Sequence, residues 1–186
     1  MKWRTIIVGA VTFAVLFSMV GCGGKSALSR GKAQKVIQAS DKFTPGAGYP
    51  EVSLNAGAVQ SGLQAGFWEK AGQRRFIYDP IFVLTPKGKT YFSLIVSLNA
   101  DESGPTRVTL KPMPRRVTEV TGVTDGPGIL GPPGTIKDVQ FTWKWDLDPL
   151  PQEVKPFLGT EPPPSKGEAL LKLYDDGWRV EQVNLP

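Results

Sequence analysis

The sequence predicts an α+β fold, in which an N-terminal helix at about residues 29–39 packs on a curved antiparallel sheet of six to seven strands. A segment with helical spacing comes first, and segments with period-two alternation follow from residue 73 to the end. Pro and Gly residues separate these segments. Nine Phe, five Trp and four Tyr indicate a packed core, because disordered chains contain few aromatic residues. A helix followed by a run of strands is typical of the α+β class.

The helix is predicted from its cap and its spacing. Ser29 can accept a hydrogen bond from the first turn, and Ala33, Val36 and Ile37 repeat at helical spacing. The segment 44–50 contains Pro and Gly residues that end regular structure.

Weaker patterns follow before residue 73. Val52 and Leu54 indicate a short strand. Residues 61–70 contain two apolar side chains four apart and could form a short helix. Gly62 and Gly66 argue against its stability.

A hairpin is predicted from residues 76–84 and 91–98, joined by a turn at 85–88. Pro80 implies a bulge or an edge position in the first strand. The second strand is expected to point these side chains into the core: Phe92, Leu94, Val96 and Leu98.

The remaining strands are predicted at 107–110, 116–123, 139–147, 168–174 and 178–185. The last two form a hairpin around Asp175-Asp176-Gly177, a strong turn signal. Two loops rich in Pro and Gly lie between strands, at 125–134 and 148–165. The second contains six prolines, and loops of that length are either functional or disordered.

The composition limits the chemistry available. The chain has no His, which excludes Ser-His-Asp and Cys-His nucleophile systems and all His-ligated metal sites. A single Cys excludes an intramolecular disulfide and a Cys-rich metal site. The net charge of +5 falls to +3 from Cys22 onward, because Lys2 and Arg4 precede it. That balance does not indicate a nucleic-acid surface.

The N-terminus has the pattern of a secretory signal. Lys2 and Arg4 form a basic start, and residues 6–20 are uncharged and rich in aliphatic side chains. The apolar run is short for a membrane-spanning helix, which needs about 20 residues. It ends in Met19-Val20-Gly21-Cys22.

These four residues resemble the lipobox of bacterial lipoproteins, in which a Cys follows a small residue at the end of the apolar run. The resemblance implies cleavage before Cys22, diacylglycerol on its thiol and acylation of the new amino terminus, with palmitate as an expected chain. Met19 departs from the Leu usual at its position. The alternative is a free Cys at the end of an uncleaved membrane helix.

The resemblance divides the chain into a signal peptide at 1–21, a lipidated tether at 22–28 and a single α+β domain at 29–186. It implies a lipid-anchored, extracytoplasmic protein of the cell membrane. In Gram-negative lipoproteins an Asp after the Cys usually signals retention at the inner membrane. Gly23 stands there instead, which favours the periplasmic face of the outer membrane.

The last third of the chain, which ends in a strand, an Asp-Gly turn and the Trp178 strand, is similar to NTF2-like and cystatin-like folds. The similarity implies a sheet with a pocket beside a helix. It transfers no catalytic residue to this chain.

Phe141, Trp143 and Trp145 lie on one face of the clearest predicted strand. Such a row could stack bases or sugars. The alternative is the core face of a half-buried strand, which perfect alternation favours.

Two acid pairs could serve as acid–base groups: Asp146 with Asp148, and Asp175 with Asp176. Asp148 precedes a Pro and so begins a loop, whereas the second pair lies in a tight turn, where Asp is common for structural reasons. Three basic clusters could form an anion patch or could protect sheet edges. They are Arg74-Arg75, Arg115-Arg116 and Lys87 with Lys89.

These observations predict a non-enzymatic binding or scaffolding module of the cell envelope, with no catalytic residue, cofactor, metal or nucleic-acid partner. Its expected partners are the membrane, through lipidated Cys22, and an envelope protein. The alternative is an NTF2-like small-ligand-binding protein or carboxylate-based enzyme with a pocket between helix and sheet. A third possibility, an accessory lipoprotein for assembly or secretion, would present an exposed apolar patch or an open sheet edge.

Overall fold

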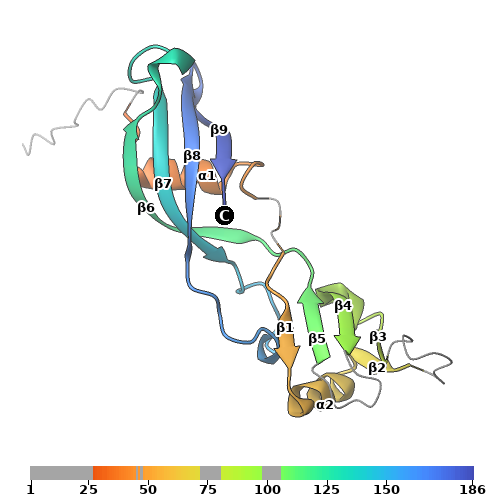
Figure 1. The fold of residues 1–186 in the computed structure, drawn as a ribbon. Coiled ribbons are helices and arrows are strands. Elements are labelled where there is room, and N and C mark those ends of the chain that lie inside the picture. Colours follow the sequence, from red (N-terminus) through yellow and green to blue (C-terminus); the bar gives the residue numbers. More distant parts are fainter. Residues whose placement is uncertain (1–26, 45, 47, 72–80, 98–105) are drawn as a thin grey trace, which may run out of the picture.

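The computed structural model describes residues 27–44, 46, 48–71, 81–97 and 106–186. Within these residues the fold has three α-helices and nine strands in three separate sheets (Figure 1). Strands hold 42% of the described residues and helices, with two short 3-10 helices included, hold 20%, so the described part is mostly β. The molecule is elongated, with the largest sheet at one end and the smaller sheets at the other (Figure 1).

The large sheet has four antiparallel strands in the order β6-β7-β8-β9. Its strands are β6 (Arg115–Asp125), β7 (Ile136–Trp145), β8 (Ser165–Tyr174) and β9 (Gly177–Asn184). Helix α1 (Arg30–Gln38) lies across one face of this sheet (Figure 1). Ser29 accepts a hydrogen bond from the Lys32 N–H at 3.3 Å, so the helix begins with a side-chain cap.

The other end of the molecule contains two smaller sheets. One has the order β1-β5-β4, from β1 (Val52–Leu54), β5 (Thr106–Leu110) and β4 (Phe92–Ser97). The other pairs β2 (Trp68–Lys70) with β3 (Phe82–Leu84). Two helices accompany them, α2 (Ala56–Gln64) and α3 (Gly88–Tyr91).

The predicted α+β class with one curved sheet of six to seven strands is therefore wrong. The hairpin predicted from residues 76–84 and 91–98 does not form, because β3 pairs with β2 and β4 pairs with β5. The segment after β3 leads into helix α3 instead of the predicted turn between strands at 85–88. The Thr85 hydroxyl accepts from the Gly88 N–H at 3.0 Å, and the Thr85 carbonyl accepts from the Lys89 N–H at 2.9 Å. Residues 72–80 of the predicted first strand lie outside the described residues.

The predicted inward face of β4 is also wrong. The pairing of β4 with β5 shifts between Phe92 and Leu94. One extra residue in a strand moves all later side chains to the opposite face. Phe92 and Ile95 are consequently buried, whereas Leu94 is 50% and Val96 38% exposed. Leu98, predicted to point inward as well, lies outside the described residues.

Two hydrophobic cores fill the molecule. One lies between α1 and the large sheet and includes Ile37, Phe141 and Leu171. The other lies among the smaller sheets, α2 and the long loop after β7, and includes Trp68 and Phe92.

The loop at 148–165, expected to be functional or disordered, is part of the second core. Val154, Phe157 and Leu158 are buried there. The Phe157 ring packs edge-on against Trp68 and Phe67, with centroid distances of 5.2 and 5.5 Å. The loop thus leaves the large sheet, closes the core at the other end and returns as β8 (Figure 1).

Candidate functional site

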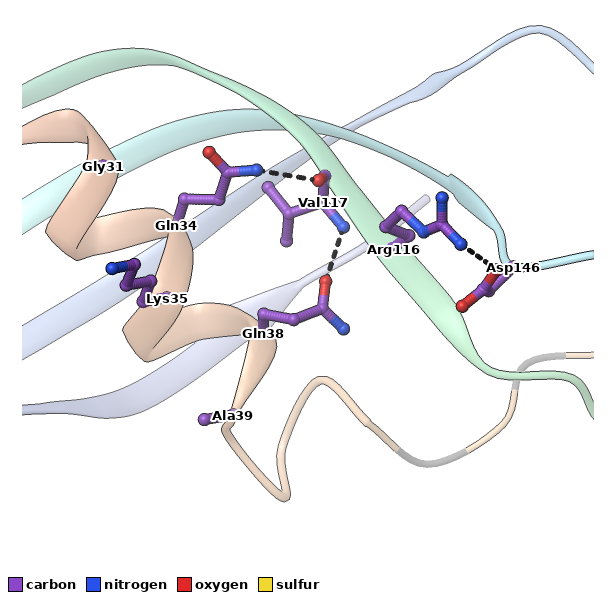
Figure 2. A pocket seen from close by; sticks show the side chains of 8 residues that line it. All are labelled: Gly31, Gln34, Lys35, Gln38, Ala39, Arg116, Val117 and Asp146. Atoms are coloured by element: carbon purple, nitrogen blue, oxygen red, sulfur yellow. Dashed lines mark hydrogen bonds and ion pairs between the residues drawn. The ribbon is translucent and has the colours of Figure 1, made fainter. Parts of the chain in front are cut away.

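A cleft beside α1 is the strongest candidate site in the described part of the chain. It has a volume of about 690 Å³ and lies between α1 and the edge strand β6 (Figure 2). Its lining residues are Gly31, Gln34, Lys35, Gln38 and Ala39 from the helix side, with Arg116 and Val117 from β6 and Asp146 from the residue that follows β7.

Two glutamines of α1 occupy the free edge of β6. Gln38 donates from Nε2 to the Arg115 carbonyl at 2.9 Å and accepts from the Val117 N–H at 2.8 Å. These are the two bonds that a residue of a neighbouring parallel strand would make. Gln34 donates to the Val117 carbonyl at 3.1 Å (Figure 2). The helix therefore closes part of an exposed sheet edge, which would otherwise be open to pairing with another chain.

An arginine between two carboxylates forms the opposite wall. Arg116 donates from Nη2 to both Asp146 and Asp148, which lie just after β7. The Arg116 guanidinium lowers the pKa of Asp148, through its hydrogen bond first and its charge second. The two carboxylates raise the pKa of Arg116 in turn. The cluster is accordingly an ion-paired group and not a carboxyl pair that shares a proton.

A smaller cavity of about 240 Å³ continues from this cluster toward the second core. Lys144 pairs there with Glu161 of the long loop at 3.1 Å, and Lys155 adds a further positive charge. The cavity is lined by three basic and three acidic side chains, so their formal charges cancel. They are Arg116, Lys144 and Lys155, and Asp146, Asp148 and Glu161. The cavity therefore offers no net charge to a ligand.

The cleft has little chemistry of its own. Its glutamine amides bind the strand, and its guanidinium binds carboxylates. The side chain of Lys35, on the exposed side of α1, makes no hydrogen bond or ion pair with the other described residues. In the described part of the chain, no three side chains are grouped in a way that could hold a metal ion. Thr106 is the one polar residue that is buried in that part of the chain, so no carboxyl group is buried among the described residues.

The aromatic row predicted on β7 belongs mainly to the core. Phe141 and Trp143 are buried against α1, which confirms the core interpretation for these two side chains. Trp145 is half-buried and contacts both cores. No part of the row forms an open stacking surface.

The predicted acid pairs differ in their surroundings. Asp146 and Asp148 do lie together, joined by Arg116. Asp175 and Asp176 occupy the turn between β8 and β9, where Asp176 pairs with Arg179. Gly177, the next residue, has φ +133°, a value that favours glycine.

The basic clusters do not form one patch. Arg115 turns inward, donating to the Phe43 carbonyl and lying over the Phe43 and Trp143 rings, whereas Arg116 turns outward. Burial lowers the pKa of Arg115. Lys87 binds the Ala65 carbonyl at 2.9 Å and Glu153 at 3.1 Å. Arg74 and Arg75 lie outside the described residues, as does the predicted lipid-attachment residue Cys22.

Sequence reasoning did not single out Gln34 and Gln38. The available signal was an amide pair four residues apart on one helix face, but the edge it binds is more than 75 residues away along the chain. Among the described residues, no helix is long and apolar enough to cross a membrane.

Comparison of the chain with protein-family models, with curated proteins and with solved structures finds no match. Its function is therefore inferred from its own residues.

Proposed function

We propose that this chain is a lipid-anchored, extracytoplasmic module that binds or scaffolds a partner at the cell envelope and catalyses no reaction. The observation that carries the proposal is the position of Cys22, at the end of an uncharged apolar run and just before the folded domain. A thiol is the group that takes the diacylglycerol. Two or three acyl chains anchor a protein stably, at about 0.8 kcal/mol per buried methylene.

The start of the fold supports a short tether. Leu28 packs against the core beneath α1, and α1 itself begins at Arg30. Five residue steps separate Cys22 from Ala27, a span of roughly 18 Å at full extension. A lipid on Cys22 would therefore keep the large sheet close to the membrane surface. In a Gram-negative cell that membrane would be the outer one, because Gly23 stands where an Asp would signal retention at the inner membrane.

The arrangement of polar groups favours binding over catalysis. The alternative, an NTF2-like ligand binder or carboxylate enzyme, needs a pocket between helix and sheet. The space between α1 and the face of the large sheet is filled by Ala33, Ile37 and the sheet residues they contact, and the cleft described above lies at the β6 edge instead. Arg116 holds both Asp146, which lines the cleft, and Asp148, which lines the smaller cavity beside it. A lowered pKa keeps Asp148 ionised, which removes it as a general acid at neutral pH.

The anchor is tested by comparing Cys22→Ser with the wild type in bacteria fed a palmitate analogue. The wild type should carry the label and enter the detergent phase, and Cys22→Ser should lose the label. Ser26→Ala, a tether change that keeps the thiol, should behave as the wild type does. A wild type that is unlabelled and retains its N-terminal segment would support an uncleaved membrane helix and overturn the proposal.

The binding role is tested separately by photo-crosslinking in the native envelope. A photoreactive residue at Lys35 probes the cleft, and one at Gln140 probes the opposite, polar face of the sheet. A discrete adduct from Lys35 alone would identify the cleft as the binding surface. Absence of any adduct from either position would argue against a partner at these two surfaces.

A further inference from the structure

The loop between β6 and β7 presents an apolar tip to solvent. Its residues 126–134 carry no charge, and a short 3-10 turn, Gly128–Leu130, forms the tip. Ile129 is 94% exposed and Leu130 is 45% exposed. Single exposed apolar residues are common on soluble proteins. Two adjacent ones at the end of a protruding loop form a more unusual feature, which marks contact surfaces.

Hydrogen bonds fix the loop in this shape. The Gly126 N–H donates to the Ile136 carbonyl at 3.0 Å, and the Thr135 hydroxyl donates to the Pro132 carbonyl at 2.7 Å. The Leu130 N–H donates to the Pro127 carbonyl at 3.1 Å. At the base of the loop, Asp125 pairs with Lys137 at 2.5 Å. The fold therefore holds the apolar tip outward.

The start of the described chain lies against the same loop. Ala27 and Leu28 line one shallow pocket together with Pro133, Gly134 and Thr135. The loop stands at the end of the large sheet remote from the smaller sheets (Figure 1). Since Cys22 is at most roughly 18 Å of chain from Ala27, the acyl chains and the apolar tip would be at the same end of the molecule.

We infer that the loop 126–134 is a second membrane contact, with Ile129 and Leu130 inserted into the leaflet that holds the acyl chains of Cys22. This inference rests on the proposed lipid anchor. A lipid bilayer is the surface that fits this tip, because residues 126–134 carry no charge and the neighbouring Asp125 is ion-paired with Lys137. Apolar side chains at such a surface bury about 5–10 Å into the headgroup and acyl boundary. The anchor and the loop together would fix the orientation of the domain, with the smaller sheets directed away from the membrane.

The chain offers a clean test, because its only natural Cys would be blocked by lipid. A cysteine at Gly128 fits, since a Cβ there meets no atom within 4 Å. The lipidated Gly128→Cys protein, labelled with an environment-sensitive dye, is reconstituted in vesicles of phosphatidylethanolamine and phosphatidylglycerol with brominated acyl chains. We expect at least roughly twofold quenching of the dye, since the interfacial depth lies within reach of the bromines.

Two further variants complete the test. Adding Ile129→Ser and Leu130→Ser should abolish the quenching, whereas a dye at Gln64→Cys, on α2, should remain unquenched throughout. Circular dichroism checks that each variant is folded. A membrane-bound protein whose dye at 128 is as exposed to water as the dye at 64 would overturn the inference. A second result would also overturn the inference: a dye at 128 that is not quenched by bromine but becomes more shielded from water as more protein is added per vesicle. That result would indicate that a second copy of the protein covers the loop.

Failure of the anchor itself gives a different result. The unsubstituted chain would then react with the dye at Cys22, because its thiol would carry no lipid, even where an uncleaved apolar segment keeps the chain with the vesicles.

Discussion

The ring of Tyr49 meets the indole of Trp145 edge-on, with centroids 5.2 Å apart. The same indole lies 5.0 Å from that of Trp143. Tyr49 belongs to the core of the smaller sheets and Trp143 to the core beneath α1. The Tyr49 hydroxyl also donates to the Leu158 carbonyl at 3.2 Å, which ties the long loop to this contact. Trp145 is consequently a packing link between the two ends of the molecule.

Replacing Trp145 with Ala should uncouple the two cores. We expect the free energy of unfolding to fall by about 2–4 kcal/mol, below the full cost for a buried aromatic because the side chain is half-buried. Hydrogen exchange should then show different opening energies for β5 and β8, which we expect to open together in the wild type. Leu150→Ala and Leu173→Ala, each next to one core only, should lower stability without this separation. Unchanged, uniform protection in Trp145→Ala would contradict the link.

Gln38→Met should expose the edge of β6. The substitution leaves the Arg115 carbonyl and the Val117 N–H without their partner, at a cost of about 1–3 kcal/mol. Exchange of the Val117 amide should accelerate. Lys32→Met, on the solvent side of the same helix, is the control and should change stability by less than about 0.5 kcal/mol. Equal stability of the two variants would mean that the amide bonds do not stabilise the fold.

Gly62 on α2 should tolerate no side chain. A Cβ there would lie 1.8 Å from the Trp68 ring, which is buried and whose indole N–H donates to the Val59 carbonyl. Gly62→Ala should cost about 1–3 kcal/mol or more through overpacking. Gly57→Ala on the same helix meets nothing closer than 3.4 Å and should be neutral or stabilising by up to about 1 kcal/mol. Thermal unfolding of both variants measures the contrast; a Gly62→Ala protein as stable as Gly57→Ala would show that Trp68 packs elsewhere.

The Arg116 cluster should make stability depend on pH in the acid range. Arg116 lowers the folded-state pKa of Asp148 below its ordinary value of 3.8. The pair therefore stabilises the fold above that pH, and its contribution is lost as the pH falls through the lowered pKa. Asp148→Asn should unfold at a lower temperature than the wild type at pH 7, and the difference should shrink below pH 3.8.

The matched control for that experiment is Asp138→Asn. Asp138 is an exposed residue of β7 that makes no ion pair with the rest of the described chain. Its substitution should shift the unfolding temperature little at either pH. A difference for Asp148→Asn that does not vary with pH would contradict the ion-pair account.

Local patterns predicted the large sheet better than the smaller ones, where helix α2 occupies Ala56–Gln64 and not residues 61–70. The alternation at 139–147 became β7, because a strand with one buried face must alternate, and Asp175-Asp176-Gly177 became the turn between β8 and β9. The arrangement of the sheets depends on contacts distant in sequence. The pairing of Val52 with Val108 and the shift between Phe92 and Leu94 leave no local signal.

The candidate site likewise combines residues visible in a local pattern with contacts that are distant in sequence. The spacing of Asp146 and Asp148 was visible, but their partner Arg116 is placed beside them by the register of β6 with β7, in which Arg116 lies opposite Lys144. The role of Gln38 depends on how α1 crosses the sheet, which no pattern within the helix determines.

The most direct test of the lipid anchor is the mass of the N-terminal peptide from protein isolated out of its native membranes. We predict a peptide that begins at Cys22 and carries the mass of diacylglycerol, with a further acyl group on the amino terminus. A peptide that begins at Met1, or one with an unmodified Cys22, would contradict the account.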